Sequence, residues 1–154
     1  AENVRLALRR HGVPEEDVED RVAHSLEVVG LGGWGDRLPA ELSGGMRKRA
    51  GLARAVAPAP DYLLYDEPTS GLDPVTTSMI DELILRLKAE LDATSLVVTH
   101  NMESAYRIAD RMALLHSGRA RWIGTPEAFQ EEDDGAIRAF VEGRRDLWPE
   151  EDVA

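Results

Sequence analysis

The sequence of 154 residues contains no cysteine, two lysines and one glutamine. The lack of cysteine excludes disulfides, thiolate nucleophiles and zinc sites built on cysteine. No apolar run approaches the roughly 20 residues that a membrane-spanning helix needs, and no charged-then-apolar leader opens the chain. Basic residues are also fewer than acidic ones: 18 Lys and Arg against 29 Asp and Glu, which gives a formal net charge of −11. This balance argues against a nucleic-acid binder that works through bulk positive charge, and we expect a cytosolic protein.

Apolar residues make up 43% of the chain, which is enough for the core of one ordinary domain. Helical apolar spacing alternates with short apolar runs, so we expect an α/β fold with right-handed crossovers and a parallel sheet. The expected elements are buried strands at 62–65 and 96–99, a hairpin of 112–115 with 121–123, and helices at 3–11, 14–29, 43–56, 74–91, 103–109, 126–130 and 136–141.

The first chemical pattern is Leu42-Ser43-Gly44-Gly45-Met46 at the start of an expected helix. Two glycines let a ligand approach the backbone, and the N–H groups of a helix N-terminus favour an anion. The pattern therefore predicts a phosphate contact. The simpler alternative is that Ser43 caps the helix and the glycines form a turn.

The second pattern is an apolar run, 62–65, that ends in Asp66 and Glu67. The first carboxylate is suited to hold Mg²⁺, which prefers oxygen ligands, and the second to polarise an attacking water. The alternative is an acidic strand end that forms a turn. His100 follows the next strand, where an imidazole could bond a terminal phosphate or serve as an ordinary turn residue. Asp73, in a tight loop between them, is also a candidate helix N-cap.

These patterns together resemble the nucleotide-binding domain of ABC transporters. The order is Leu42-Ser43-Gly44-Gly45, then Asp66-Glu67-Pro68, then Ser70-Gly71-Leu72-Asp73, then Thr99-His100. The resemblance implies the C-terminal part of a P-loop NTPase (RecA-like) ABC ATPase core with a parallel sheet, plus a helical subdomain. It divides the chain into a helical subdomain with the signature motif at 1–60, half of the core at 61–124, and C-terminal helices with an acidic tail at 125–154.

The resemblance also implies a role for each motif. Ser43, Gly44 and Gly45 match the signature motif, which contacts the γ-phosphate of ATP held by the partner subunit. Asp66 matches the Walker B carboxylate that holds Mg²⁺, and Glu67 matches the catalytic base. Asp73 matches the D-loop residue, and His100 matches the switch histidine. The implied cofactors are ATP and Mg²⁺, and the implied partners are a second ATPase subunit in a closed dimer and a transmembrane permease, with no nucleic acid. The implied location is the inner face of the cell membrane.

One part of the family pattern has no counterpart in the sequence. A phosphate-cradling loop needs Gly-Lys followed by Ser or Thr, but Lys48 follows Arg47 and Lys88 follows Leu87. The family's Q-loop glutamine is also absent, since Gln130 lies far downstream. Because the chain opens with Ala1, we expect a truncated form of an ABC-type ATPase that does not hydrolyse ATP by itself. The alternative is a non-catalytic cassette fragment that acts only by dimerisation or binding.

The residues after the signature indicate a branch of the superfamily. Met46-Arg47-Lys48-Arg49-Ala50 and Ile137–Gly143 resemble the Mla and Mce branch, which moves phospholipids or other hydrophobic molecules. The alternatives are that Met46 and the arginines are ordinary variation on an exposed helix, or that the basic run meets the phosphates of the partner subunit or the permease. ABC-type proteins of DNA repair or chromosome structure are disfavoured, because they carry a long coiled coil or zinc-binding cysteines. The alternative of a translation-associated ABC protein with two cassettes is not excluded by the sequence.

Overall fold

The computed structural model describes residues 1–144 and divides the chain into two compact units. The first unit is Ala1–Thr99 and the second begins at His100. Each unit is described by itself. The boundaries at 60 and 124 that the sequence suggested remain predictions.

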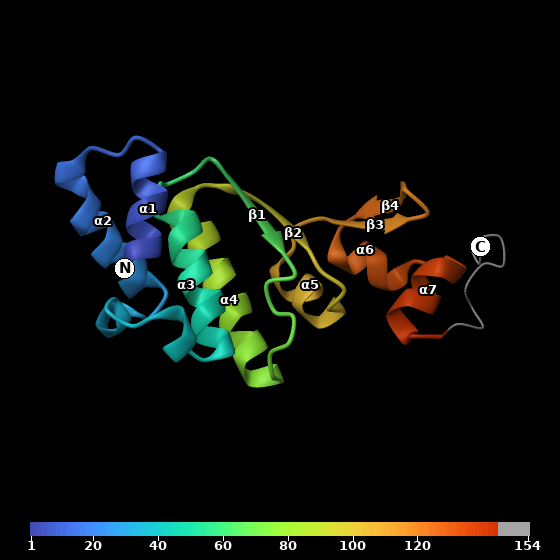
Figure 1. Ribbon diagram of the computed structural model, residues 1–154. Helices are drawn as coiled ribbons and strands as arrows, with labels where there is room; N and C mark the ends of the chain where they lie inside the picture. The colour runs from blue at the N-terminus through green and yellow to red at the C-terminus, as the bar shows by residue number, and fades with distance from the viewer. Residues whose placement is uncertain (145–154) are drawn as a thin grey trace. The chain divides into compact units, whose positions relative to one another are not determined.

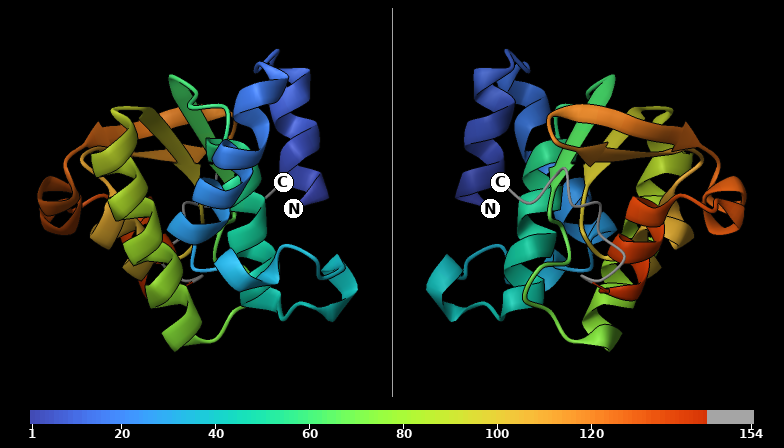
Figure 2. Two further views of the ribbon diagram at one scale, coloured as in Figure 1. Left: turned by 90° about the vertical axis from the view of Figure 1, so that its left-hand side faces the viewer. Right: turned by 90° about the vertical axis from the view of Figure 1, so that its right-hand side faces the viewer.

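Three helices of the first unit pack against one another at the N-terminal end of the chain (Figures 1 and 2). They are α1 (Glu2–Arg10), α2 (Glu15–Val28) and α3 (Gly44–Val56). Their apolar residues recur at helical spacing and are buried, as burial of one apolar face requires. The buried residues are Val4, Leu8, Val18, Val22, Leu26, Leu52, Ala53 and Val56. The predictions of these three helices are confirmed.

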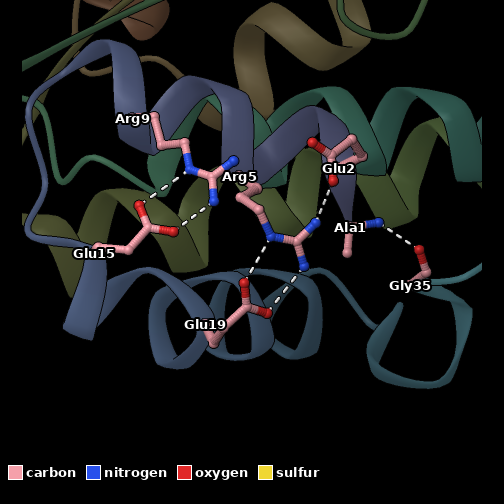
Figure 3. A network of polar contacts seen from close by, with 7 residues as sticks. All are labelled: Ala1, Glu2, Arg5, Arg9, Glu15, Glu19 and Gly35. Carbon is pink, nitrogen blue, oxygen red and sulfur yellow. Dashed lines mark hydrogen bonds and ion pairs between the residues drawn. The ribbon is translucent and has the colours of Figure 1, made fainter.

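Charged side chains tie α1 to α2 on their exposed faces (Figure 3). The Arg5 guanidinium donates to both carboxylate oxygens of Glu19, at 2.6 and 2.9 Å, and also bonds Glu2. Arg9 makes a similar pair with Glu15. Hydrogen bonding to Arg5 lowers the pKa of Glu19. Because these groups are exposed, water and salt screen the pairs, and they add little beyond orienting two helices whose buried faces already match.

Two short 3₁₀ turns, η1 (Gly32–Trp34) and η2 (Pro39–Glu41), lie in the glycine-rich connector between α2 and α3. The Glu41 carboxylate accepts a hydrogen bond of 2.7 Å from the Leu38 N–H, which closes the second turn. Leu42 is then buried, and Ser43 begins α3 as its N-cap. The connector therefore delivers the Ser-Gly-Gly sequence to the start of a helix, as expected.

A parallel pair of strands follows α3: β1 (Tyr62–Asp66) and β2 (Thr94–Val98). The parallel pairing is confirmed, but the expectation of two buried strands is wrong for one face. Leu63 and Tyr65 are buried, whereas Leu64 is 77% exposed and its register partner Leu96 is 60% exposed. Side chains alternate between the faces of a sheet, and within the first unit only one face of this pair is covered. The second strand also begins two residues earlier than predicted.

Helix α4 (Pro74–Leu91) connects the two strands. The Asp73 carboxylate caps it by accepting hydrogen bonds of 3.0 Å from the N–H groups of Val75 and Thr76. Pro74 occupies the first helical position, where no N–H is needed. Apolar spacing at Met79, Leu83 and Leu87 predicts one buried face for this helix. Leu83 and Leu87 are buried, but Met79 is 51% exposed and Ile80 is buried instead.

The second unit begins with α5 (Met102–Ile108) and continues with the antiparallel strands β3 (Met112–His116) and β4 (Arg119–Gly124). Ser117 and Gly118 both have positive φ, at 48° and 74°, as a two-residue hairpin turn requires. Helices α6 (Pro126–Glu131) and α7 (Gly135–Glu142) complete the unit. Its core residues Leu114, Phe129 and Ile137 are packed by partly buried aromatic and methionine side chains. The hairpin and the terminal helices predicted from the sequence are confirmed.

Asp73 gives a testable dependence of stability on pH. Its bonds to the hydroxyl and backbone N–H of Thr76 lower the pKa of Asp73. A lowered carboxyl pKa stabilises the fold above its unfolded value, about 4 for Asp, and this contribution is lost as the pH falls through the folded value. We expect Asp73→Asn to unfold at lower urea concentration than the parent protein at pH 7, and the difference to shrink at pH 3. Asp36→Asn, at an exposed turn, is the control. A difference that is equal at both pH values would contradict this account.

Candidate functional site

The start of α3 is the first part of the candidate site. The Ser43 hydroxyl oxygen accepts a hydrogen bond of 3.2 Å from the Met46 N–H, so Ser43 is the N-cap that the simpler interpretation expected. Gly44 and Gly45 occupy the first two helical positions, where backbone N–H groups have no partner within the helix. The Arg47 guanidinium donates to the Leu42 carbonyl at 2.7 Å and fixes the entry to the helix. The Ser43 cap occupies the Met46 N–H and leaves the N–H groups of Gly44 and Gly45 without a partner inside the helix, so the predicted phosphate contact keeps backbone donors.

The starts of α3 and α4 meet at Gly45. A Cβ atom built on Gly45 would lie 2.6 Å from Cγ2 of Thr76, and one built on Gly44 would lie 3.7 Å from a methyl group of Leu72. Thr76 cannot easily rotate away, because its hydroxyl donates to the Asp73 carboxylate at 2.5 Å. Glycine at position 45 therefore permits the close approach of the signature-like sequence to the loop that carries Asp73.

A shallow pocket of about 390 Å³ lies where these two segments meet. The start of α3 contributes two of its charged side chains, Arg47 and Lys48, and the 70–72 loop contributes the opposite wall. The lining residues are Gly44, Arg47, Lys48, Gly51, Ser70, Gly71 and Leu72. The structure thus brings together two of the motifs that the sequence separates by about 25 residues, and it gives their common surface positive charge.

Asp66 and Glu67 stand at the carboxyl end of β1, as predicted. Asp66 is the last residue of the strand and is exposed. Glu67 follows with φ of +47°, a conformation uncommon for a residue other than glycine. Its N–H donates to the Val98 carbonyl at 2.9 Å, which extends the parallel ladder by one bond. One carboxylate oxygen of Glu67, Oε2, is screened from solvent.

The backbone carbonyl of Glu67 accepts hydrogen bonds from two directions. The Lys48 ammonium donates to it at 2.9 Å from α3, and the Ser70 N–H donates at 3.3 Å. The Lys48 contact could not be predicted from the sequence, because a helix of unknown orientation does not reveal which loop one of its side chains reaches. In the first unit the Lys48 ammonium bonds the Glu67 carbonyl, and the interpretation that the basic run meets a partner's phosphates or a permease remains a prediction. The only local hint was that Lys48 lies four residues after Gly44, on the same helix face.

His100 belongs to the second unit, which it opens. It is exposed and precedes Asn101, whose side chain caps α5 by accepting from the Ser104 N–H at 3.1 Å. Ser43, Gly44, Gly45, Asp66, Glu67 and Asp73 all lie in the first unit. The assignment of His100 to the same site remains a prediction.

The residues present fit the predicted cofactors. Mg²⁺ takes oxygen ligands and commonly uses one or two carboxylates together with water and phosphate oxygens. Asp66 offers an exposed carboxylate of this kind. In the described part of the chain, residues 1–144, no cluster of three or more metal-binding side chains occurs, so water and phosphate oxygens would supply the other ligands. The start of α3 offers N–H donors and nearby positive charge to a phosphate. Among the same residues, no helix is both long and apolar enough to cross a bilayer.

Comparison with known proteins agrees with this arrangement. Residues 2–70 match the family model described as ABC transporter. The chain resembles solved ABC transporter structures as well. One is cbiO1 of Clostridium perfringens, part of the cbiONQ transporter complex, with a TM-score of 0.76 and 27% identity over 94% of this chain and 57% of that one. Another is a metal-chelate type ABC transporter in an inward-facing conformation, with a TM-score of 0.79 and 24% identity over 91% of this chain and 56% of that one.

Curated relatives narrow the class to ATP-binding proteins of ABC transporters. A protein of Mycobacterium leprae named ribonucleotide transport ATP-binding protein mkl is 43% identical over 94% of this chain and 42% of its own length. Methionine import ATP-binding protein MetN 1 of Rhodopseudomonas palustris is 47% identical over 90% of this chain and 38% of its own length. The chain therefore spans well under half the length of these relatives. The chain therefore resembles the ATP-binding domains of ABC transporters, and its fold is that of the solved ABC transporter ATPases.

The contact between Gly45 and Thr76 predicts the effect of a single methyl group. We expect Gly45→Ala to lower the free energy of unfolding by about 1–3 kcal/mol, the usual cost of overpacking, despite the better helix propensity of alanine. Thr76→Ser removes the opposing methyl group but keeps the hydroxyl that bonds Asp73. In that background Gly45→Ala should be neutral or stabilising. Urea denaturation of the two single variants and the double variant measures the coupling, and purely additive effects would show that the two helix starts do not touch.

Proposed function

We propose that this chain is the C-terminal part of an ATP-hydrolysing subunit of an ABC transporter. The observation that carries the proposal is the placement of Glu67 directly after a parallel strand and beside the start of α3, with one carboxylate oxygen screened from solvent. A carboxylate in this position is suited to accept a proton from a water molecule. The family match and the relatives named ATP-binding proteins support the same reaction.

In this proposal each motif keeps a separate task. Glu67 orients the attacking water and accepts its proton, while Asp66 holds Mg²⁺, which when bound neutralises charge on the phosphates. Ser43, Gly44 and Gly45 donate hydrogen bonds to the terminal phosphate of ATP that a second subunit holds. Asp73 sits on the same surface and contacts that subunit. His100 bonds the terminal phosphate, as the resemblance of Thr99-His100 implies.

The proposed assembly is a two-fold pair of ATPase subunits bound to a transmembrane permease on the inner face of the membrane. The pocket between the start of α3 and the 70–72 loop supports the pairing, because it presents positive charge on the surface where a partner's nucleotide would lie. The solved relative that is part of a multi-subunit transporter complex supports the same kind of assembly.

For the transported molecule we propose a phospholipid or another hydrophobic substrate. The support is the sequence of 46–50 and of 137–143, which resembles the Mla and Mce branch. The relatives' names mention ribonucleotide and methionine instead. ATP turnover by the complex reconstituted with its permease separates these substrates, because the transported class should stimulate it. We expect stimulation by phospholipid, and stimulation by methionine or a ribonucleotide alone would replace the proposed substrate.

A catalytic role for Glu67 is tested by Glu67→Gln in protein made from the complete natural reading frame. Loss of a general base typically costs about 10²–10⁴-fold, so kcat should fall by at least 100-fold while ATP binding persists. Glu82→Gln removes the same charge from an exposed position of α4 and should leave turnover unchanged. Steady-state phosphate release and equilibrium binding of ATP measure the two effects.

Two results of these assays would change the proposal. Unchanged turnover in Glu67→Gln would remove Glu67 as the base. A complete reading frame without ATP turnover would favour the alternative of a non-catalytic cassette that acts by dimerisation or binding. Residues 1–154 alone are expected to be inactive, because their sequence contains no Gly-Lys phosphate loop.

A further inference from the structure

Glu67 occupies a backbone conformation that the surrounding structure must maintain. Its φ of +47° lies in the left-handed region, which non-glycine residues adopt only when other contacts hold them there. The same peptide segment directs the Glu67 carboxylate, so a change in its backbone angles would move the carboxylate away from the end of β1. The contacts that hold this backbone therefore also set the position of the side chain.

Three hydrogen bonds hold the Glu67 backbone. Its N–H is bound by the Val98 carbonyl of β2, at 2.9 Å, and its carbonyl accepts from Ser70 at 3.3 Å and from Lys48 at 2.9 Å. The first two bonds come from the neighbouring strand and from the same loop. The third bond comes from Lys48 of α3. Its ammonium makes a charge-assisted bond, which is stronger than a bond between neutral groups. The side chain of Lys48 is partly buried, so water competes for this bond less than at the open surface.

We propose that Lys48 is a positioning residue for Glu67. Its ammonium fixes the Glu67 carbonyl, holds the residue in the left-handed conformation, and so keeps the carboxylate in its place after β1. Because Lys48 lies one helical turn after Gly44, the same bond links Glu67 to the start of α3. A ligand that shifts the start of α3 would then also shift Glu67. This inference rests on the proposed role of Glu67 as the base.

The structural part of the inference can be tested in the 154-residue chain without ATP. Lys48→Met keeps an unbranched side chain, one atom shorter than lysine, and removes the donor. The only other lysine of the sequence allows Lys88→Met as a matched control on α4. Without the Lys48 bond the Glu67 backbone should leave its left-handed conformation more often, which breaks the bond from the Glu67 N–H to the Val98 carbonyl. We therefore expect Lys48→Met to speed hydrogen exchange of the Glu67 amide by about ten-fold or more. The ¹³C shifts of Glu67 should also move away from left-handed values. Lys88→Met should do neither.

Two further variants keep this test decisive. Lys48→Arg retains a charged donor and should restore slow exchange in part. If Lys48→Met does not fold, Lys48→Gln, which keeps a neutral N–H donor, takes its place with the same direction of change. Folded Lys48→Met protein with unchanged Glu67 shifts and exchange would overturn the inference.

The functional part uses the complete natural reading frame. Lys48→Met should lower kcat by about ten-fold or more, since small displacements of a catalytic group are costly, and leave KM for ATP within about two-fold. Lys48→Arg should recover part of kcat. If Glu67→Gln abolishes turnover but Lys48→Met retains full kcat, the positioning role fails and the proposed function stands. If Glu67→Gln keeps full turnover, the proposed function fails and the positioning role fails with it.

Discussion

The hydrogen bond from Lys48 to the Glu67 carbonyl joins the two halves of the first unit's candidate site. One half is the start of α3, with Ser43, Gly44 and Gly45, and the other is the end of β1, with Asp66 and Glu67. Helices α1 and α2 pack against α3 through buried apolar faces, and α3 in turn contacts α4. The position of a carboxylate after a strand thus depends on the packing of a helix that belongs to a different part of the sequence. A lysine suits this task because its long flexible stem can reach a carbonyl while its charge strengthens the bond.

The residues that resemble catalytic motifs also cap helices and allow two helix starts to pack closely. Ser43 caps α3 and Asp73 caps α4, and the two helix starts meet where Gly45 contacts Thr76. The structural and the functional interpretation of these residues are therefore compatible. Capping orders a helix start, and an ordered helix start presents fixed N–H donors to an anion. The small side chain at position 45 has the further consequence that a second loop, with Asp73, lies beside those donors.

The sequence predicted the parts of the fold that depend on local chemistry. Helical apolar spacing located α1, α2 and α3, and Asp73-Pro74 marked the start of α4, because caps and amphipathic faces act over a few residues. Burial was harder to predict. Leu64 and Leu96 are apolar yet exposed, and Met79 is exposed where Ile80 is buried, because burial depends on which other elements cover each face. In the site, motif order predicted that Asp66 and Glu67 follow a strand. The contact of Lys48 with Glu67 could not be predicted, since it depends on how α3 is turned against the loop.

The most direct test of this account is a nuclear Overhauser spectrum of the 154-residue chain that observes Gly45 and Thr76. The account predicts a strong cross-peak between the α protons of Gly45 and the γ-methyl group of Thr76, because only a glycine at position 45 allows the approach seen there. Such a peak would show that α3 and α4 bring the signature-like sequence beside the loop with Asp73. Its absence, in a protein whose α3 and α4 show normal sequential helical contacts, would contradict the arrangement on which the candidate site depends.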